Sequence, residues 1–261
     1  MAFGDTFGRL SFAAAALALF TASCAPPAPT APPGTKVLKD FTLFDGTGKA
    51  PVGNQSMIID DKGRISWVGP TAELKAPNGA ETTELAGKYV MPGLIDLHVH
   101  ISIVRGLKQD IAFYTEENVK QDLQNFAKFG VTTVQVMGTD KDLIFPLRDA
   151  QRAGKPTMAR VYTAGQGIVF KGGYGGVVGL NQPVATVDEA IAAVNAQADK
   201  KVDLIKFWFD DALGTIPKMP AAMSKAIIDT AHARGRKVVA HIFYLADTKP
   251  LIDHGLDGIL H

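Results

Sequence analysis

The residues of this sequence that are best suited to chemistry are four histidines and one lysine at the ends of apolar runs. They are His98, His100, Lys206, His241 and His261. On a β-strand, residues i and i+2 project to the same side, so His98 and His100 would share one face, with Val99 on the other. Two imidazoles on one face are positioned to hold a metal ion. Lys206 lies inside the run Asp203–Phe209. An ammonium buried there must lose its charge or have it neutralised.

Each of these residues also has a simpler interpretation. A His-x-His pair can be two core histidines satisfied by hydrogen bonds. A lysine on a strand can extend to the rim, and a histidine at a strand end can cap the strand or pack in the core. The metal-site hypothesis is favoured because all five residues fall at or near the carboxyl ends of predicted strands.

From Tyr89 onward the sequence alternates between strand and helix patterns. The predicted strands are Ile95–Ile101, Val131–Met137, Ala159–Ala164, Val202–Phe209, Lys237–Ile242 and Gly258–His261. The predicted helices are Glu116–Phe129, Asp142–Ala153, Val187–Lys200, Met219–Arg234 and Asp247–His254. This alternation predicts an α/β fold with a parallel sheet and right-handed crossovers. A closed eight-stranded barrel takes about 250 residues. We therefore interpret residues 91–261 as an incomplete (β/α)8 TIM-like barrel, with six of eight strands, in a C-terminally truncated chain.

Residues 36–90 have a different pattern. Short apolar or alternating runs at Val37–Phe44, Ser56–Asp60 and Arg64–Val68 are separated by turn residues. This pattern predicts a small antiparallel β-sandwich unit that precedes the barrel.

The first 35 residues resemble an export signal and a spacer. An apolar run, Leu10–Phe20, follows a short segment with one arginine and is too short to span a membrane. Small residues and Cys24 follow, as in a bacterial lipobox, so residues 1–23 are predicted to be a lipoprotein signal peptide and Cys24 to be lipidated. The alternative is a plain signal peptide with an incidental thiol. Residues 24–35 are rich in proline, which predicts a stiff tether. The predicted signal and tether together predict a protein at the periplasmic side of a bacterial membrane, in the cell envelope.

Composition excludes several classes of protein. The chain has 261 residues, with 27 Lys+Arg against 26 Asp+Glu and a formal net charge of +1, so we expect no nucleic-acid partner. A single cysteine excludes a disulfide framework and a Cys-rich zinc module. Neither composition nor motifs indicate an oligomeric state.

Three segments carry a resemblance to a known family. They are Gly87–Asp96, Gly130–Val134 and Ala198–Lys206. With the His-x-His, Lys, His, His order, the chain resembles the amidohydrolase superfamily, closest to its imidazolonepropionase-like and Xaa-Pro dipeptidase (prolidase-type) branch. The resemblance implies two divalent metal ions. His98 and His100 would bind the first and His241 and His261 the second, and Lys206, carboxylated on its amine, would bridge both.

The resemblance also implies a mechanism and a metal. A metal-bridging hydroxide would attack an amide carbon, and an aspartate at the end of an eighth strand would transfer the proton. That aspartate is not among the 261 residues, so we expect this form, expressed alone, to be insoluble or inactive. Nitrogen and carboxylate-type oxygen ligands make zinc the default metal, with manganese, iron and cobalt open.

A glycine-rich segment, Gly165–Gly179, is predicted to be a long loop over the site. It has neither the spacing of a dinucleotide-binding loop nor that of a phosphate loop. Lys171 or Tyr174 within it could contact substrate, or the segment could be a lid without direct contact. His232 and His254 near helix ends are interpreted as structural. Asp96 is open to a supporting role behind the metal or to an ordinary hydrogen-bonded role.

Two functions follow from these observations. The first is a metal-dependent amidohydrolase that cleaves a C–N amide bond in a dipeptide, an N-acyl amino acid or a cyclic amide. The alternative is a non-catalytic envelope lipoprotein that keeps the fold as a binding module. Metal content and the presence of an aspartate on an eighth strand would discriminate between them.

Overall fold

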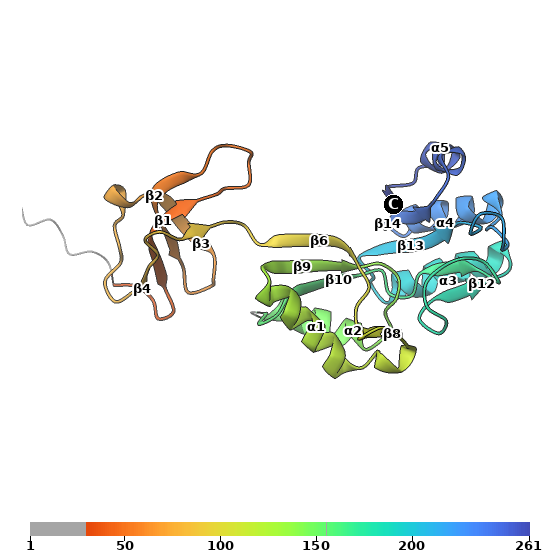
Figure 1. Ribbon diagram of the computed structural model, residues 1–261, viewed down its shortest axis with the longest axis horizontal. Coiled ribbons are helices and arrows are strands. Elements are labelled where there is room, and N and C mark those ends of the chain that lie inside the picture. Colours follow the sequence, from red (N-terminus) through yellow and green to blue (C-terminus); the bar gives the residue numbers. More distant parts are fainter. Residues whose placement is uncertain (1–29, 155) are drawn as a thin grey trace, which may run out of the picture. The chain divides into compact units, whose positions relative to one another are not determined.

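The computed structural model describes residues 30–154 and 156–261, which form two compact units divided between Pro92 and Gly93 (Figure 1). The predicted signal peptide, Cys24 and the first half of the tether, residues 24–29, lie outside the described residues. Within the described part of the chain, no helix is both long and apolar enough to span a membrane.

The first unit is built on one five-stranded sheet. Its strands are β1 (Lys36–Leu43), β2 (Val52–Ile59), β3 (Ile65–Pro70), β4 (Glu81–Glu84) and β5 (Tyr89–Val90). The order is β3-β2-β1-β4, and β5 also pairs with β1. Val37 and Phe41 of β1 are buried.

The prediction of an antiparallel sandwich is wrong in two respects. The strands form a single sheet, and β4 and β5 pair with β1 in parallel, while only β1, β2 and β3 are antiparallel. The reason is the connection after β3. Residues 71–80, which begin with the 3-10 helix Thr71–Glu73, lead the chain from the β3 edge of the sheet to the opposite edge, where β4 runs in the direction of β1. A tight hairpin turn would have produced an antiparallel neighbour.

The second unit contains two parallel sheets. The first has the order β10-β9-β6 and the second has the order β12-β11-β13-β14-β15. The strands are β6 (Leu94–Val99), β9 (Val131–Val136), β10 (Arg160–Thr163), β11 (Ile168–Phe170), β12 (Gln182–Val184), β13 (Leu204–Phe209), β14 (Lys237–Ile242) and β15 (Gly258–Leu260). A short hairpin, β7 (Val104–Arg105) and β8 (Lys108–Gln109), and a 3-10 helix, Ile111–Phe113, follow β6.

Five helices connect these strands. They are α1 (Glu116–Lys128), α2 (Ile144–Ala153), α3 (Val187–Asp199), α4 (Ala221–Ala233) and α5 (Leu245–Asp253). Local sequence explains where two of them begin. The hydroxyl of Thr115 accepts a hydrogen bond from the backbone N–H of Asn118 at the start of α1, and Thr186 does the same for Glu189 at the start of α3.

All six predicted strands and all five predicted helices are present, with ends shifted by a few residues. The glycine-rich segment differs from the prediction, because β11 lies inside it and pairs with β12 and β13. The strand β11 takes the place beside β13 that a simple barrel would give to β10. The residue just before β13 bonds to β10, where Asp203 donates its backbone N–H to the carbonyl oxygen of Thr163 at 2.8 Å. Among the described residues, the two sheets do not close into a barrel.

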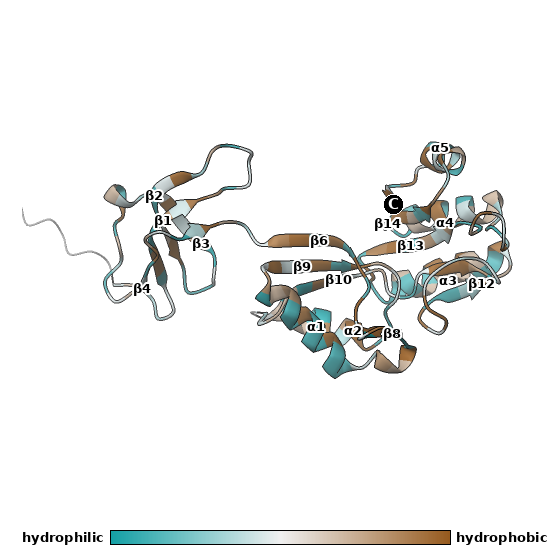
Figure 2. Cartoon of the chain, in the orientation of Figure 1, coloured by the Kyte–Doolittle hydropathy of each residue, from teal (hydrophilic) through white to brown (hydrophobic). Residues whose placement is uncertain are grey.

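The two faces of each strand have different partners. Ile205, Phe207 and Phe209 of β13 pack in a buried cluster with residues of α3 and α4, whereas Lys206 lies on the other face. Val99 of β6 likewise packs in a second cluster with residues of α1. Figure 2 shows the strands mostly in the hydrophobic colour, while α1 carries hydrophilic residues on part of its surface. The face of the sheets turned away from the helices therefore carries the chemistry described next.

Candidate metal centre and active site

The sheets bring the four histidines together at the carboxyl ends of their strands. His98 lies near the end of β6, with His100 just after it. His241 lies in β14, opposite Trp208 of β13 and Leu260 of β15. His261 follows β15. The ring centroids form a chain of contacts: His98 to His100 at 5.3 Å, His98 to His261 at 4.8 Å and His241 to His261 at 4.7 Å.

These histidines form pairs of neighbours. Within the described residues, no three side chains of His, Cys, Asp or Glu come close enough together to hold one metal ion as a group.

Lys206 is a buried side chain next to this cluster. It is 1% exposed, and within the part of the chain that the structure describes its Nζ atom has no hydrogen-bond partner. Nζ lies 4.9 Å from the centroid of the Trp208 ring. Burial lowers the pKa of Lys206 from 10.5 to about 7. The amine is therefore partly neutral at neutral pH, and a neutral amine is a nucleophile.

The positive charge of Lys206 affects the pKa of all four histidines. Desolvation lowers the pKa of His98 and of His100 to about 4, and the positive charge of Lys206 adds to the effect in both. Desolvation and the same charge also lower the pKa of His241 and of His261. The four imidazoles are therefore neutral at pH 7, which is the form that binds metal ions.

Two hydrogen bonds restrain the imidazole rings of His100 and His241. Nδ1 of His100 lies 2.9 Å from the hydroxyl oxygen of Thr139, which follows β9. Nε2 of His241 lies 2.8 Å from Oδ2 of Asp210, the residue directly after β13. The sequence reasoning missed both Thr139 and Asp210. Their positions just after apolar strands, at the sheet edge that carries the histidines, could have indicated both residues.

A cavity of about 510 Å³ opens beside the cluster. All four histidines line it, as do Thr139, Trp208 and the glycine-rich segment around Tyr174. The Tyr174 ring stacks on His241, with centroids 4.8 Å apart and planes at 29°. Lys171, the other predicted substrate contact, is exposed in the turn after β11 and does not line this cavity.

Glycines allow the glycine-rich segment to pack on Trp208. A Cβ atom on Gly175 would lie 2.3 Å from Cγ of Trp208, and one on Gly167 would lie 2.4 Å from Cζ3 of the same ring. Gly175 also has a φ of +142°, which side-chain-bearing residues rarely adopt. Close backbone approach to the indole is thus the reason for glycine at these positions.

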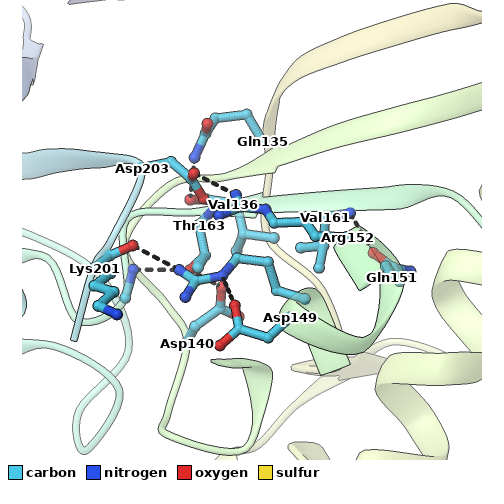
Figure 3. A network of polar contacts seen from close by, with 12 residues as sticks. Gln135, Val136, Asp140, Asp149, Gln151, Arg152, Val161, Thr163, Lys201 and Asp203 are labelled. Carbon is cyan, nitrogen blue, oxygen red and sulfur yellow. Dashed lines mark hydrogen bonds and ion pairs between the residues drawn. The ribbon is translucent and has the colours of Figure 1, made fainter. Parts of the chain in front are cut away.

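A second polar network lies behind Thr139. Asp140 is fully buried and accepts hydrogen bonds from the hydroxyls of Tyr114 at 2.8 Å and Thr163 at 2.5 Å. Burial raises the pKa of Asp140 to about 7. Figure 3 shows Asp140 and Thr163 with Asp203, whose Oδ2 accepts the backbone N–H of Thr163 at 2.9 Å. This network joins the ends of β9 and β10 to the start of β13.

The remaining candidates lie outside the cavity. Oδ1 of Asp96 accepts the backbone N–H of His98 at 3.0 Å, so its carboxylate supports the strand that carries two histidines. Nε2 of His232 lies 2.8 Å from Oδ2 of Asp257, near the carboxyl end of α4. His254 follows α5. These positions agree with the structural interpretation of His232 and His254.

Comparison with known proteins identifies the family. The model of the "Amidohydrolase family" matches residues 89–258, which is more than half of the chain. The chain belongs to the amidohydrolase family. The prediction of the superfamily is therefore confirmed, and the relatives and solved structures support its imidazolonepropionase-like and prolidase-like branch.

Two curated relatives and one solved structure illustrate the likeness. An uncharacterized protein of Mycobacterium tuberculosis is 30% identical over 222 residues, which are 79% of this chain and 51% of the relative. An imidazolonepropionase of Acidiphilium cryptum is 49% identical over 39 residues, which are 15% of this chain and 10% of the relative. The crystal structure of a Xaa-Pro dipeptidase with bound methionine in the active site matches with a TM-score of 0.71 and 24% identity, over 86% of this chain and 61% of that one.

The structural likeness shows a TIM-barrel-like α/β fold. The chain spans about half the length of the curated relative from Mycobacterium tuberculosis. The amidohydrolase family is one of hydrolases that act on amide bonds and generally use divalent metals.

The residues of the cluster fit such metals. Four neutral imidazoles are nitrogen donors of the kind that divalent metals bind. Among the described residues, the buried Nζ of Lys206 has no hydrogen-bond partner, and a buried amine without one is costly.

Proposed function

We propose that the whole protein is a metal-dependent amidohydrolase that cleaves a C–N amide bond in a dipeptide, an N-acyl amino acid or a cyclic amide. The observation that carries the proposal is the convergence of four neutral imidazoles on a buried lysine that has no hydrogen-bond partner among the described residues. We further infer that the six predicted strands of residues 91–261, which are β6, β9, β10, β13, β14 and β15, are six of the eight strands of a TIM-like barrel, whose carboxyl edge carries the active site in this fold.

In this proposal His98 and His100 hold one divalent ion, and His241 and His261 hold a second. Zinc suits these nitrogen ligands. Two bound ions would supply a water molecule of lowered pKa and polarise the amide carbonyl. The chain's own residues hold neutral imidazoles in place and shield the site with the glycine-rich segment.

Lys206 is proposed to bridge the ions as a carbamate. Its neutral Nζ adds to the carbon of CO2, forming an N–C bond, and releases one proton to water. The product is an anion with two oxygen ligands, which matches the need of two cations. The low pKa of the amine supports this step, because a protonated amine has no lone pair to form the bond.

Tyr174 is proposed to contact the substrate, since its ring borders the cavity and stacks on His241. Lys171 is the weaker candidate, because its side chain is exposed and does not line the cavity. Val177, Val178 and Ile216 also line the cavity, so apolar groups of a substrate have partners there.

The test uses the intact gene product. Purified wild type is expected to contain two metal ions per chain by elemental mass spectrometry and to hydrolyse members of a panel of dipeptides, N-acyl amino acids and cyclic amides. His98→Asn and His241→Asn should each lose metal and lower kcat/KM by at least about 100-fold. His232→Asn, which changes a histidine outside the cavity, is the matched control.

Two results would contradict the proposal. One is a wild-type protein that binds no metal under any loading condition. The other is unchanged turnover in both His98→Asn and His241→Asn. Metal binding without any hydrolysis would instead favour the binding-module alternative.

The localisation is also a proposal. We propose export through residues 1–23 and lipid attachment at Cys24, on the sequence pattern alone. Metabolic labelling with radioactive palmitate should label the wild type in a bacterial host and should not label Cys24→Ser. Equal labelling of both proteins would reject the anchor.

A further inference from the structure

We propose that Asp210 is a positioning residue that determines which ring nitrogen of His241 is free to bind a metal ion. The inference rests on the proposed function, because it assumes that His241 is a ligand. It assigns a role to a residue that does not line the cavity.

The carboxylate of Asp210 is fixed at both oxygens. Oδ1 accepts the backbone N–H of Ala212 at 2.8 Å, and Oδ2 lies 2.8 Å from Nε2 of His241. The side chains of Asp210 and His241 are 7% and 13% exposed, so water competes little for this contact. The carboxylate can therefore neither rotate away nor be easily replaced by solvent.

The bond determines the tautomer of the ring. A carboxylate oxygen accepts hydrogen bonds, so Nε2 of His241 carries the hydrogen in this pair. Nδ1 then keeps its lone pair, and the described residues offer Nδ1 no hydrogen-bond partner. Nδ1 is thus the nitrogen that remains available as a ligand.

Stacking restrains the same ring in a second direction. Tyr174 lies against the face of His241, which limits tilting of the ring plane. The bond to Asp210 limits rotation within that plane. Together they hold the imidazole in one orientation before any ion binds, which reduces the entropy lost on binding.

The neighbouring residue provides a matched control. Asp211 is also a carboxylate after β13, but it accepts hydrogen bonds from the Tyr244 hydroxyl at 2.9 Å and from the backbone N–H of Gly214 at 2.9 Å. It also pairs with Lys218 at 3.1 Å. None of these partners is a histidine of the cluster, so loss of Asp211 tests the effect of loosening the same loop.

The experiment measures zinc binding by the intact gene product in competition with a chromogenic chelator. Asp210→Ala is expected to weaken binding of one of the two zinc ions by about 10- to 100-fold and to leave the other within twofold. Asp211→Ala should leave both within twofold. Equal binding in Asp210→Ala and wild type, or equal weakening of both ions, would overturn the proposal, and so would the same loss in Asp211→Ala.

A second measurement does not depend on metal. In metal-free protein labelled with 15N-histidine, the His241 ring should be protonated at Nε2 in wild type and should populate both tautomers in Asp210→Ala. Asp210→Asn, which keeps the size of the side chain, should also lose the single tautomer, because an amide can donate to Nε2 as well as accept from it. An unchanged tautomer in both variants overturns the proposal. A wild type that shows the tautomer but binds no zinc would instead contradict the proposed function.

Discussion

Lys206 permits a quantitative test, because replacing it with an apolar residue should stabilise the metal-free protein. The amine is 1% exposed and has no hydrogen-bond partner in the described part of the chain, and burial lowers its pKa from 10.5 to about 7. Since one pKa unit corresponds to about 1.4 kcal/mol, the buried amine costs about 4 kcal/mol of folding free energy at pH 7. Lys206→Met fills a similar volume without a charge and should recover a large part of that cost.

The effect has a defined dependence on pH. Between pH 7 and pH 10.5 the unfolded chain binds more protons at Lys206 than the folded chain does. The wild type is therefore stabilised as the pH rises through this range. The free-energy cost of burying the Lys206 amine is fully present below the pKa of the folded state. The advantage of Lys206→Met should fall from about 4 kcal/mol at pH 7 to about 2 kcal/mol at pH 9.

The assay is urea unfolding of metal-free protein in CO2-depleted buffer, followed by tryptophan fluorescence. Trp208 lies 4.9 Å from Nζ and reports on this site, and Trp67→Phe removes the other tryptophan. Lys171→Met, at an exposed position, is the control and should change stability by less than about 0.5 kcal/mol. A Lys206→Met protein that is less stable than wild type at pH 7, or a difference that does not change with pH, would refute the reasoning.

Three further predictions concern the glycine-rich segment and the metals. Gly175→Ala should destabilise the protein by about 3 kcal/mol, because the added Cβ would overlap the Trp208 ring. Gly172→Ala has open space around it and should cost about 1 kcal/mol, because its φ is positive. Thermal unfolding compares the stabilities of the two variants, and equal losses would contradict the packing argument. Tyr174→Ala removes the ring stacked on His241 and should raise KM for amide substrates up to about tenfold while the zinc content is retained, and an unchanged KM would exclude the substrate contact. Removal of metal with a chelator should abolish hydrolysis and lower the melting temperature, and added zinc should restore both, while activity that survives complete removal would contradict metal dependence.

Much of the second unit could be predicted from local sequence. The apolar run that contains Ile205, Phe207 and Phe209 is a strand because both faces of such a run can be buried. The alternation of such runs with helix patterns identifies a parallel sheet. His98 and His100 fall on one face because of the two-residue period of a strand. These features depend on residues close together in the sequence, so the sequence alone determined them.

The pairing of strands was decided by tertiary structure. The segment after β10 contains so many glycines that its local pattern favours a loop. Ile168–Phe170 nevertheless forms β11, because its backbone groups pair with those of β13. In the first unit, β4 is parallel to β1 because the connection after β3 crosses the sheet. No local property of these residues indicates which edge of a sheet they will meet.

The electrostatic state of the site was likewise decided by the fold. The sequence indicates that Lys206 is buried, but its lack of a partner depends on what the neighbouring strands bring to its side. The bond from His241 to Asp210 joins residues 31 positions apart, and the register of β13 against β14 places them together. The types and periodicity of the residues thus determined which side chains could do chemistry. Only long-range packing decided which of them meet, because contacts between distant segments depend on the whole chain at once.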